Sequence, residues 1–132
     1  MAGELILIVE DNEKNLKLVR DVLQFKGYRT LEAKTAEDGI ALAQSQSPNL
    51  ILMDIQLPGT DGVTAIRQLR DEPRTASIPV VALTAFAMKD DRKRFLEAGF
   101  DGYLDKPINI KEFPEQVRRF CEQGRKLDSN DL

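Results

Sequence analysis

Four places in the chain carry side chains suited to chemistry, and each comes at the end of an apolar run. Asp54 follows Leu-Ile-Leu-Met, Glu10 and Asp11 follow Leu-Ile-Leu-Ile-Val, Thr84 follows Val-Val-Ala-Leu, and Lys106 comes shortly after Gly-Tyr-Leu. An ionised carboxylate beside an apolar interior is costly unless a cation or a metal ion compensates it. The position of Asp54 therefore calls for a compensating partner.

Brought together, these residue types could bind a metal ion and an anion side by side. Carboxylate oxygens in a partly open site suit Mg²⁺, which also relieves the mutual repulsion of the acids. An ammonium and a hydroxyl then suit an anion beside Asp54, an arrangement typical of an aspartate that accepts a phosphoryl group. Taken singly, each residue has a structural explanation: Asp54 as a turn former, Thr84 or Glu10 and Asp11 as helix caps, and Lys106 as a solvated charge.

The elements that would position these residues alternate along the chain. Short runs rich in Val, Ile and Leu, typical of strands buried on both faces, span Leu5–Val9, Tyr28–Ala33, Leu50–Met53, Pro79–Leu83 and Gly102–Leu104. Helical patterns span Asn15–Lys26, Ala36–Ser45, Gly62–Asp71, Met88–Ala98 and Ile110–Glu122. Expected N-caps are Thr35, Thr60 or Asp61, and Asn109, and expected C-cap glycines are Gly27 and Gly99.

This order predicts an α/β fold in which five βα units form a parallel sheet with helices on both faces. The functional crevice of such a sheet lies at the carboxyl ends of the strands. The four chemical positions all fall at such ends, which is why we expect them to converge.

Composition bounds the function further. The chain has 132 residues, 42% of them apolar, which suits one domain, expected over 1–123 with a polar tail over 124–132. A net charge of −3 does not favour a nucleic-acid partner, and the lack of His excludes His-based zinc or triad sites within the chain. A single Cys and the lack of a signal peptide or membrane span predict a cytoplasmic protein.

Four motifs together resemble the receiver domains of two-component response regulators, the CheY-like superfamily. They are VEDN at Val9–Asn12, LMDIQLPGTDG at Leu52–Gly62, LTA at Leu83–Ala85 and YLDKPI at Tyr103–Ile108. The resemblance covers about Leu5–Cys121 and is strongest to DivK-type single-domain response regulators of bacteria. It implies a doubly wound, flavodoxin-like (βα)5 fold with the strand order 2-1-3-4-5.

The resemblance also implies roles for individual residues. Asp54 would accept a phosphoryl group from a histidine kinase or a histidine phosphotransfer protein. Mg²⁺, or Mn²⁺ in its place, would be bound by Glu10, Asp11, Asp54 and the backbone carbonyl of Gln56. Lys106 and Thr84 would contact the phosphoryl group, Ala85 would leave room for it, Tyr103 would turn inward, and the Lys106–Pro107 bond would be cis. Many members have Asp where this chain has Glu10, so direct and water-mediated metal contact both stay open.

Several alternatives are weaker. A haloacid-dehalogenase-type phosphatase needs a second Asp two residues after the nucleophile, where this chain has Gln56, and a flavin carrier needs a Ser-, Thr- and Gly-rich loop in place of Glu-Asp-Asn-Glu-Lys-Asn. A receiver excised from a hybrid histidine kinase remains open, although the initial Met and short tail favour a complete protein. We therefore expect a signalling phospho-acceptor that catalyses only its own phosphoryl transfer and dephosphorylation.

Expected partner surfaces are less distinct. The first helix carries two apolar stripes, Leu16–Val19–Leu23 and Leu18–Val22–Phe25, and one should face the sheet. Asn15 and Leu18, near the site, are candidates for docking a kinase or phosphotransfer protein. The basic triplet Arg92-Lys93-Arg94 is interpreted as a solvated helix face with local ion pairs. Neither nucleic-acid binding nor membrane insertion is expected.

Overall fold

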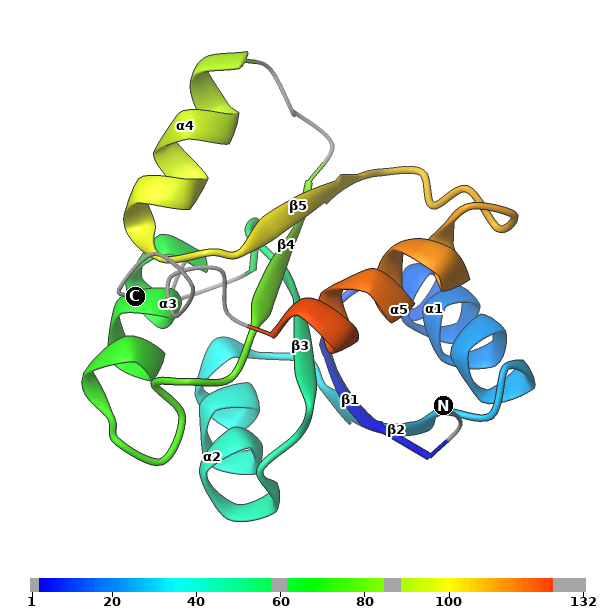
Figure 1. Ribbon diagram of the computed structural model, residues 1–132, viewed down its shortest axis with the longest axis horizontal. Helices are drawn as coiled ribbons and strands as arrows, with labels where there is room; N and C mark the ends of the chain where they lie inside the picture. The colour runs from blue at the N-terminus through cyan, green and yellow to red at the C-terminus, as the bar shows by residue number, and fades with distance from the viewer. Residues whose placement is uncertain (1–2, 58–61, 85–88, 125–132) are drawn as a thin grey trace.

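The computed structural model describes residues 3–57, 62–84 and 89–124 of the chain, which alternate between strands and helices (Figure 1). The elements are β1 (Leu5–Val9), α1 (Glu13–Phe25), β2 (Arg29–Ala33), α2 (Ala36–Gln46), β3 (Leu50–Asp54), α3 (Gly62–Asp71), β4 (Val80–Thr84), α4 (Lys89–Ala98), β5 (Gly102–Asp105) and α5 (Phe113–Gln123). The ten predicted elements are thus confirmed, with shifts of up to three residues at their ends. No helix of the described part of the chain is long and apolar enough to cross a bilayer.

The five strands form one parallel sheet in the order β2-β1-β3-β4-β5, which confirms the doubly wound α/β fold. Side chains alternate between the two faces of each strand, so the sheet has two apolar cores. One core contains Leu7, Val9, Ile51 and Met53 and is covered by α2, α3 and α4. The other contains Ile6, Ile8, Leu50 and Leu52 and is covered by α1 and α5 (Figure 1). Burial on both faces explains why the strands contain continuous apolar runs.

The N-cap residues of the first two helices can be compared with those expected from the sequence. The Thr35 side chain accepts a hydrogen bond from the Asp38 backbone N–H and caps α2 as predicted. Asn12 caps α1, accepting from the Asn15 N–H, so this helix begins two residues earlier than expected. Thr60 and Asp61 lie outside the described residues.

The expected cap at Asn109 is wrong. The structure begins α5 at Phe113, with Glu112 as an N-cap that makes no side-chain capping bond. Asn109 Oδ1 instead accepts from the backbone N–H groups of Lys111 and Glu112. Asn side chains stabilise such turns as readily as helix starts, which explains the three-residue difference from the expected start at Ile110.

Glycines end two helices as predicted. Gly27 and Gly99 have φ values of 94° and 122°, a region that L side chains rarely adopt. They turn the chain from α1 toward β2 and from α4 toward β5, respectively.

A buried ion pair fastens the end of α4 to α3. The guanidinium of Arg70 donates to the Gly99 carbonyl at 3.1 and 2.9 Å and to the Ile78 carbonyl at 2.6 Å. It also lies 2.8 Å from Asp101 Oδ2, which accepts from the Val80 N–H at 2.9 Å. The side chains of Arg70 and Asp101 are only 14% and 3% exposed. This cluster joins α3 to the start of β4 and to the loop before β5.

Candidate functional site

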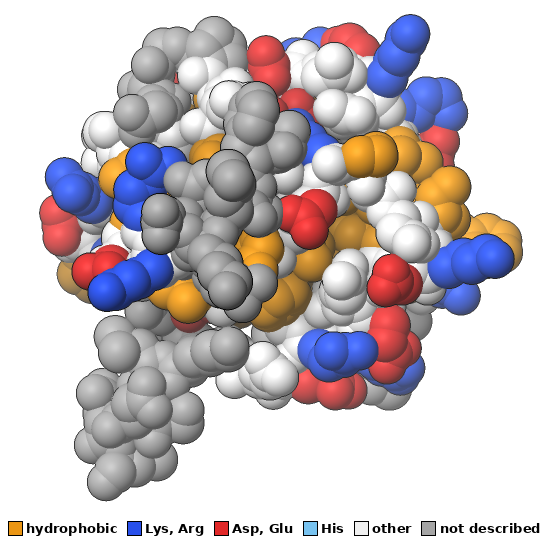
Figure 2. Space-filling model, turned by 90° about the horizontal axis from the view of Figure 1, so that it is seen from above, with side chains coloured by type: hydrophobic (Ala, Val, Ile, Leu, Met, Phe, Trp, Pro, Cys, Tyr) orange, Lys and Arg blue, Asp and Glu red, His pale blue; other side chains and the backbone are white. Residues whose placement is uncertain are grey.

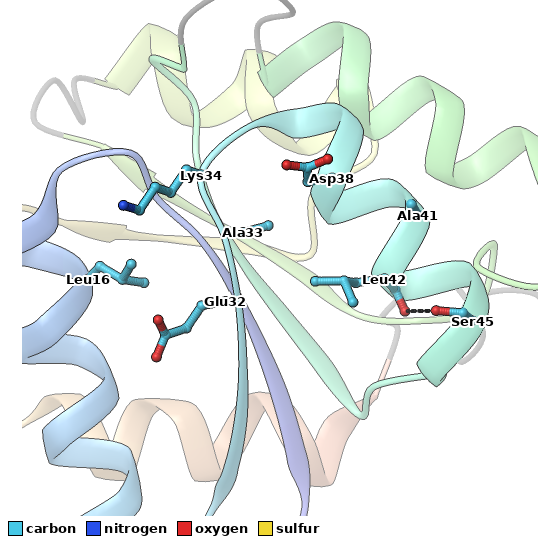
Figure 3. Close-up of a pocket in the computed structure, with 8 residues that line it drawn as sticks. All are labelled: Leu16, Glu32, Ala33, Lys34, Asp38, Ala41, Leu42 and Ser45. Atoms are coloured by element: carbon cyan, nitrogen blue, oxygen red, sulfur yellow. Dashed lines mark hydrogen bonds between the residues drawn. The ribbon is translucent and has the colours of Figure 1, made fainter.

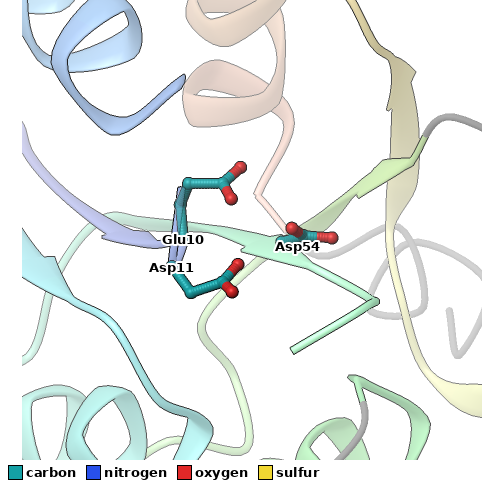
Figure 4. Close-up of side chains that lie close together, drawn as sticks. All are labelled: Glu10, Asp11 and Asp54. Atoms are coloured by element: carbon teal, nitrogen blue, oxygen red, sulfur yellow. The ribbon is translucent and has the colours of Figure 1, made fainter. Parts of the chain in front are cut away.

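The acidic residues converge where the central strands end. β1 ends at Val9, so Glu10 and Asp11 emerge at its carboxyl end, and Asp54 is the last residue of the adjacent β3. One carboxylate oxygen from each of the three acids lies within 4.8 Å of the others. Figure 4 shows Glu10 and Asp11 extending side by side toward Asp54. The parallel order of β1 and β3 therefore creates the acidic cluster expected from the sequence.

Lys106 joins the cluster from the loop after β5. Its Nζ lies 2.9 Å from Asp54 Oδ2 and 2.7 Å from Glu10 Oε1. The Lys106 backbone N–H donates to the Thr84 carbonyl at 2.8 Å, which aligns this loop with the end of β4. The Lys106–Pro107 bond is cis, in agreement with the expectation.

Backbone donors orient the other carboxylate oxygens. Asn12 N–H donates to Glu10 Oε2 at 3.1 Å, and Gln56 N–H donates to Asp54 Oδ1 at 2.9 Å. Each donor is two residues beyond its acceptor, as in an Asx-type turn. The sequence analysis did not predict these two backbone donors. The only signal for them in the sequence was an acidic residue at a position where turns form. They leave both carboxylates with a defined orientation.

Burial makes the charges in this cluster interdependent. Glu10 is fully buried and Asp54 is 5% exposed, whereas Asp11 is exposed. Burial raises the pKa of Glu10, and the hydrogen bond with Lys106 only partly opposes this effect. Burial also disfavours the Lys106 ammonium, but its contacts with Glu10 and Asp54 outweigh this, so the pKa of Lys106 is raised. Lys106 is therefore held as a cation among the acids.

The donor set fits a divalent cation. Three ionised carboxylates and one ammonium carry a formal charge of −2, and the pKa of buried Glu10 is raised, so its ionised form lacks full compensation. The acids supply hard oxygen atoms, and exposed Asp11 leaves one side of the cluster open to solvent. These properties suit Mg²⁺ or Mn²⁺.

The other expected site residues lie at different depths around the cluster. Thr84 is the last residue of β4 and is 1% exposed. Tyr103 in β5 is half-buried and packs against the core covered by α2, α3 and α4. Gln56 is exposed beside Asp54. Ala85 lies outside the described residues. The structure thus brings Glu10, Asp11, Asp54 and Lys106 together, with Thr84 on the adjoining strand end.

Comparison with known proteins agrees with this geometry. The family model for the response regulator receiver domain matches residues 6–118. The chain is 42% identical to the polar-differentiation response regulator DivK of Brucella ovis over 115 residues, which cover 87% of this chain and 94% of that protein. DivK of Brucella anthropi matches to the same extent.

Solved structures show the same fold. The receiver domain of sensor histidine kinase PA1611 from Pseudomonas aeruginosa, which has Mg²⁺ coordinated in its active-site cleft, matches with a TM-score of 0.84 and 36% identity, covering 92% of this chain and 99% of that one. The Mn²⁺-bound response regulator Rcp1 matches with a TM-score of 0.73 and 30% identity, covering 89% and 91%.

The family model covers most of the chain, and relatives and solved structures above 30% identity match it over nearly their whole length. The chain belongs to the response regulator receiver domain family.

Proposed function

We propose that this protein is a single-domain response regulator that accepts a phosphoryl group on Asp54 from a histidine kinase or a histidine phosphotransfer protein. The observation that carries the proposal is the pairing of Asp54 Oδ2 with Lys106 Nζ at 2.9 Å inside a cluster of three acids. The identity to DivK over nearly the whole length of both proteins supports it. The receiver would comprise residues 1–123, followed by a polar tail over 124–132, and would act in the bacterial cytoplasm.

The phosphoryl step needs mainly positioning and charge neutralisation from the protein. A carboxylate oxygen of Asp54 forms the new P–O bond as the P–N bond to the donor histidine breaks. The Gln56 N–H and the Lys106 ammonium each donate a hydrogen bond to one oxygen of Asp54. The carboxylate is therefore already oriented before the phosphoryl donor binds. Lys106 then pairs with oxygens of the transferred group, and the Thr84 hydroxyl donates to it while small Ala85 leaves it room.

Glu10, Asp11 and Asp54, with the Gln56 carbonyl, would hold Mg²⁺ beside the acceptor, with Mn²⁺ as a substitute. When bound, the ion neutralises charge on the phosphoryl oxygens. The metal-bound receiver structures support this assignment. The chain's own contribution is the rigid placement of its acids at the ends of two paired strands.

A partner protein would detect phosphorylation through a change in the surface of the receiver. The added charge draws Thr84 toward the phosphoryl group, and Tyr103, which is half-buried, turns inward. The surface of α4, β5 and α5 then differs between the two states, and a downstream protein distinguishes them. This is a two-state equilibrium biased by a local charge.

The donor protein would dock on the first half of α1, at Asn15 and half-buried Leu18. The two apolar stripes of α1 differ in burial, which supports docking on this helix. Leu16, Val19 and Leu23 are buried against the sheet, whereas Phe25 of the other stripe is 86% exposed. A groove of about 660 Å³ continues from Phe25 to Ile110 in the loop after Lys106. A helical bundle lying along α1 would therefore also reach the loop that carries the site lysine.

The test is labelling with acetyl phosphate and Mg²⁺, read by intact-protein mass spectrometry. We expect one phosphoryl group on the wild type, none on Asp54→Asn, and suppression by chelation of Mg²⁺. Asp105→Asn is the matched control, because Asp105 is an exposed acid at the end of β5 in the same sheet. Equal labelling of wild type and Asp54→Asn would show that Asp54 is not the acceptor.

A receiver belonging to a hybrid histidine kinase is the second candidate, favoured by the similarity to the PA1611 receiver. Both candidates share the phosphoryl chemistry. An immunoblot of native cell extract discriminates between them, since a hybrid kinase gives a band much larger than the 132-residue chain.

A further inference from the structure

A groove with a volume of about 520 Å³ lies between α3 and α4, away from the acidic cluster. It is lined by Val63, Arg67, Lys93, Arg94, Glu97 and Ala98. Arg67 follows Val63 by one helical turn on α3, and the α4 residues likewise form pairs spaced by four, so each helix presents one face to the groove. Figure 2 shows Lys and Arg side chains gathered with a few acidic ones on the left of the view, the side where Figure 1 places α3 and α4.

The charges in this groove are mostly positive. Three cationic side chains face one carboxylate, on a chain whose net charge is −3. Among the side chains that the structure describes, which do not include those of residues 89–92, neither Arg67 nor Lys93 has a carboxylate oxygen within 4.0 Å. The groove should therefore attract acidic groups.

A second hollow gives the contrast. It has a volume of about 590 Å³ and lies between α1, β2 and α2, with Leu16 and Leu42 pointing into it from opposite sides (Figure 3). The one cation that lines it is already paired: Lys34 pairs with Glu13, and Glu32 of the same rim lies 3.0 Å from Arg20. In the α3–α4 groove, by contrast, Arg67 and Lys93 have no carboxylate partner among the side chains that the structure describes.

The groove rests on a fixed base. The bonds from Arg70 to the Gly99 carbonyl hold the end of α4 against α3. Beneath it, Ile66 of α3 and Phe95 of α4 are 0% and 1% exposed in the same core. A packed interior of this kind keeps its shape, so the positions of the two helices that form the groove are fixed by the fold.

We propose that the groove binds an acidic amphipathic helix of a partner protein. Half-buried Val63 and Ala98 provide a small apolar floor, and the cations on both walls match acids spaced by three or four residues on the incoming helix. Glu97 matches a single basic residue of that helix. The same carboxylate, together with the net charge of the chain, disfavours a nucleic acid. The groove shares no residue with the phosphoryl site, so this inference stands apart from the proposed function.

Fluorescence anisotropy with a labelled, Ala-based helical peptide bearing Glu at every third or fourth position tests the proposal. We expect saturable binding that weakens with added salt. Arg67→Gln and Lys93→Gln should each weaken it about two- to fivefold, whereas Glu97→Gln should strengthen it by a similar factor. Arg118→Gln and Lys111→Gln, exposed residues outside the groove, are matched controls and should leave it unchanged.

Amide chemical shifts measured during the titration should change around Val63, Arg67 and Lys93–Ala98. Absence of saturable binding, equal effects of the groove and control variants, or equally tight displacement of the peptide by single-stranded DNA would each overturn the proposal. Asp54→Asn should bind the peptide like the wild type, so failure here is distinguishable from failure of the phosphoryl-acceptor assignment.

Discussion

Removing the carboxylate of Asp101 should unfold the protein far more easily than removing an acid from an exposed ion pair. Asp101 is 3% exposed and receives both the Arg70 guanidinium and the Val80 N–H. The Asp101→Ala change leaves Arg70, which is 14% exposed, without its carboxylate, and leaves the first N–H of β4 without this acceptor.

The magnitude follows from burial. Breaking a buried ion pair by removing one partner costs about 3–5 kcal/mol, because a charge is left in a poorly solvated place. Arg70 retains the carbonyls of Gly99, Ile78 and Ala76, which still solvate its charge. The cost should therefore fall near the lower limit, about 3 kcal/mol. With a urea m-value of about 2 kcal/mol/M, the midpoint of unfolding should fall by about 1.5 M.

The assay is urea unfolding followed by circular dichroism at neutral pH. Asp21→Ala is the comparison, since Asp21 lies only 2.6 Å from Lys17 but both side chains are about half or more exposed. That shorter pair should contribute little, because solvent screens it. Arg70→Met combined with Asp101→Ala should recover part of the loss. Equal midpoints for Asp101→Ala and Asp21→Ala would refute the assignment of the Arg70–Asp101 pair as a structural fastening.

Two further predictions concern the switch and the single thiol. Thr84→Ala should leave Asp54 able to accept phosphate but reduce the phosphorylation-dependent gain in partner affinity, measured by titration calorimetry of both forms; a full wild-type gain in the phosphorylated variant would contradict the role of Thr84. Burial raises the pKa of Cys121 from 9.0 to about 11. At pH 8.5 the folded protein should therefore hold about a hundredfold less thiolate than the unfolded chain, and iodoacetamide should modify it correspondingly slowly, with the rate rising toward pH 11. Equal alkylation rates in buffer and in urea at pH 8.5 would be inconsistent with that pKa.

The sequence predicted the elements that depend on strong local patterns. Continuous apolar runs marked the strands because both faces of the sheet are covered, and the strand ends then located Glu10, Asp11 and Asp54. The starts of α1 and α5 were shifted because Asn12 and Asn109 each suit both a helix cap and a turn, and only the packed chain selects between them.

Features made by tertiary contact were not predictable. Arg70 has the spacing of an ordinary surface arginine on an amphipathic helix, and its acceptors come from segments up to 31 residues away. The basic triplet at 92–94 was interpreted as a solvated helix face, and Lys93 and Arg94 are exposed, but their sharing of a groove with Arg67 of α3 could not be predicted from the sequence. Such pairings depend on how helices pack, which residue spacing alone does not specify.

The fastening of α4 by Arg70 has a mechanical consequence. With its C-terminal end held at Gly99, α4 is a lever whose pivot lies at that glycine and whose other end is linked by a few residues to Thr84. A ten-residue helix is about 15 Å long, so a rotation of about 10° around the pivot displaces the far end by about 2.6 Å and the pivot end hardly at all. Displacement is therefore largest at the end of α4 that follows β4 and smallest at the Arg70 contact.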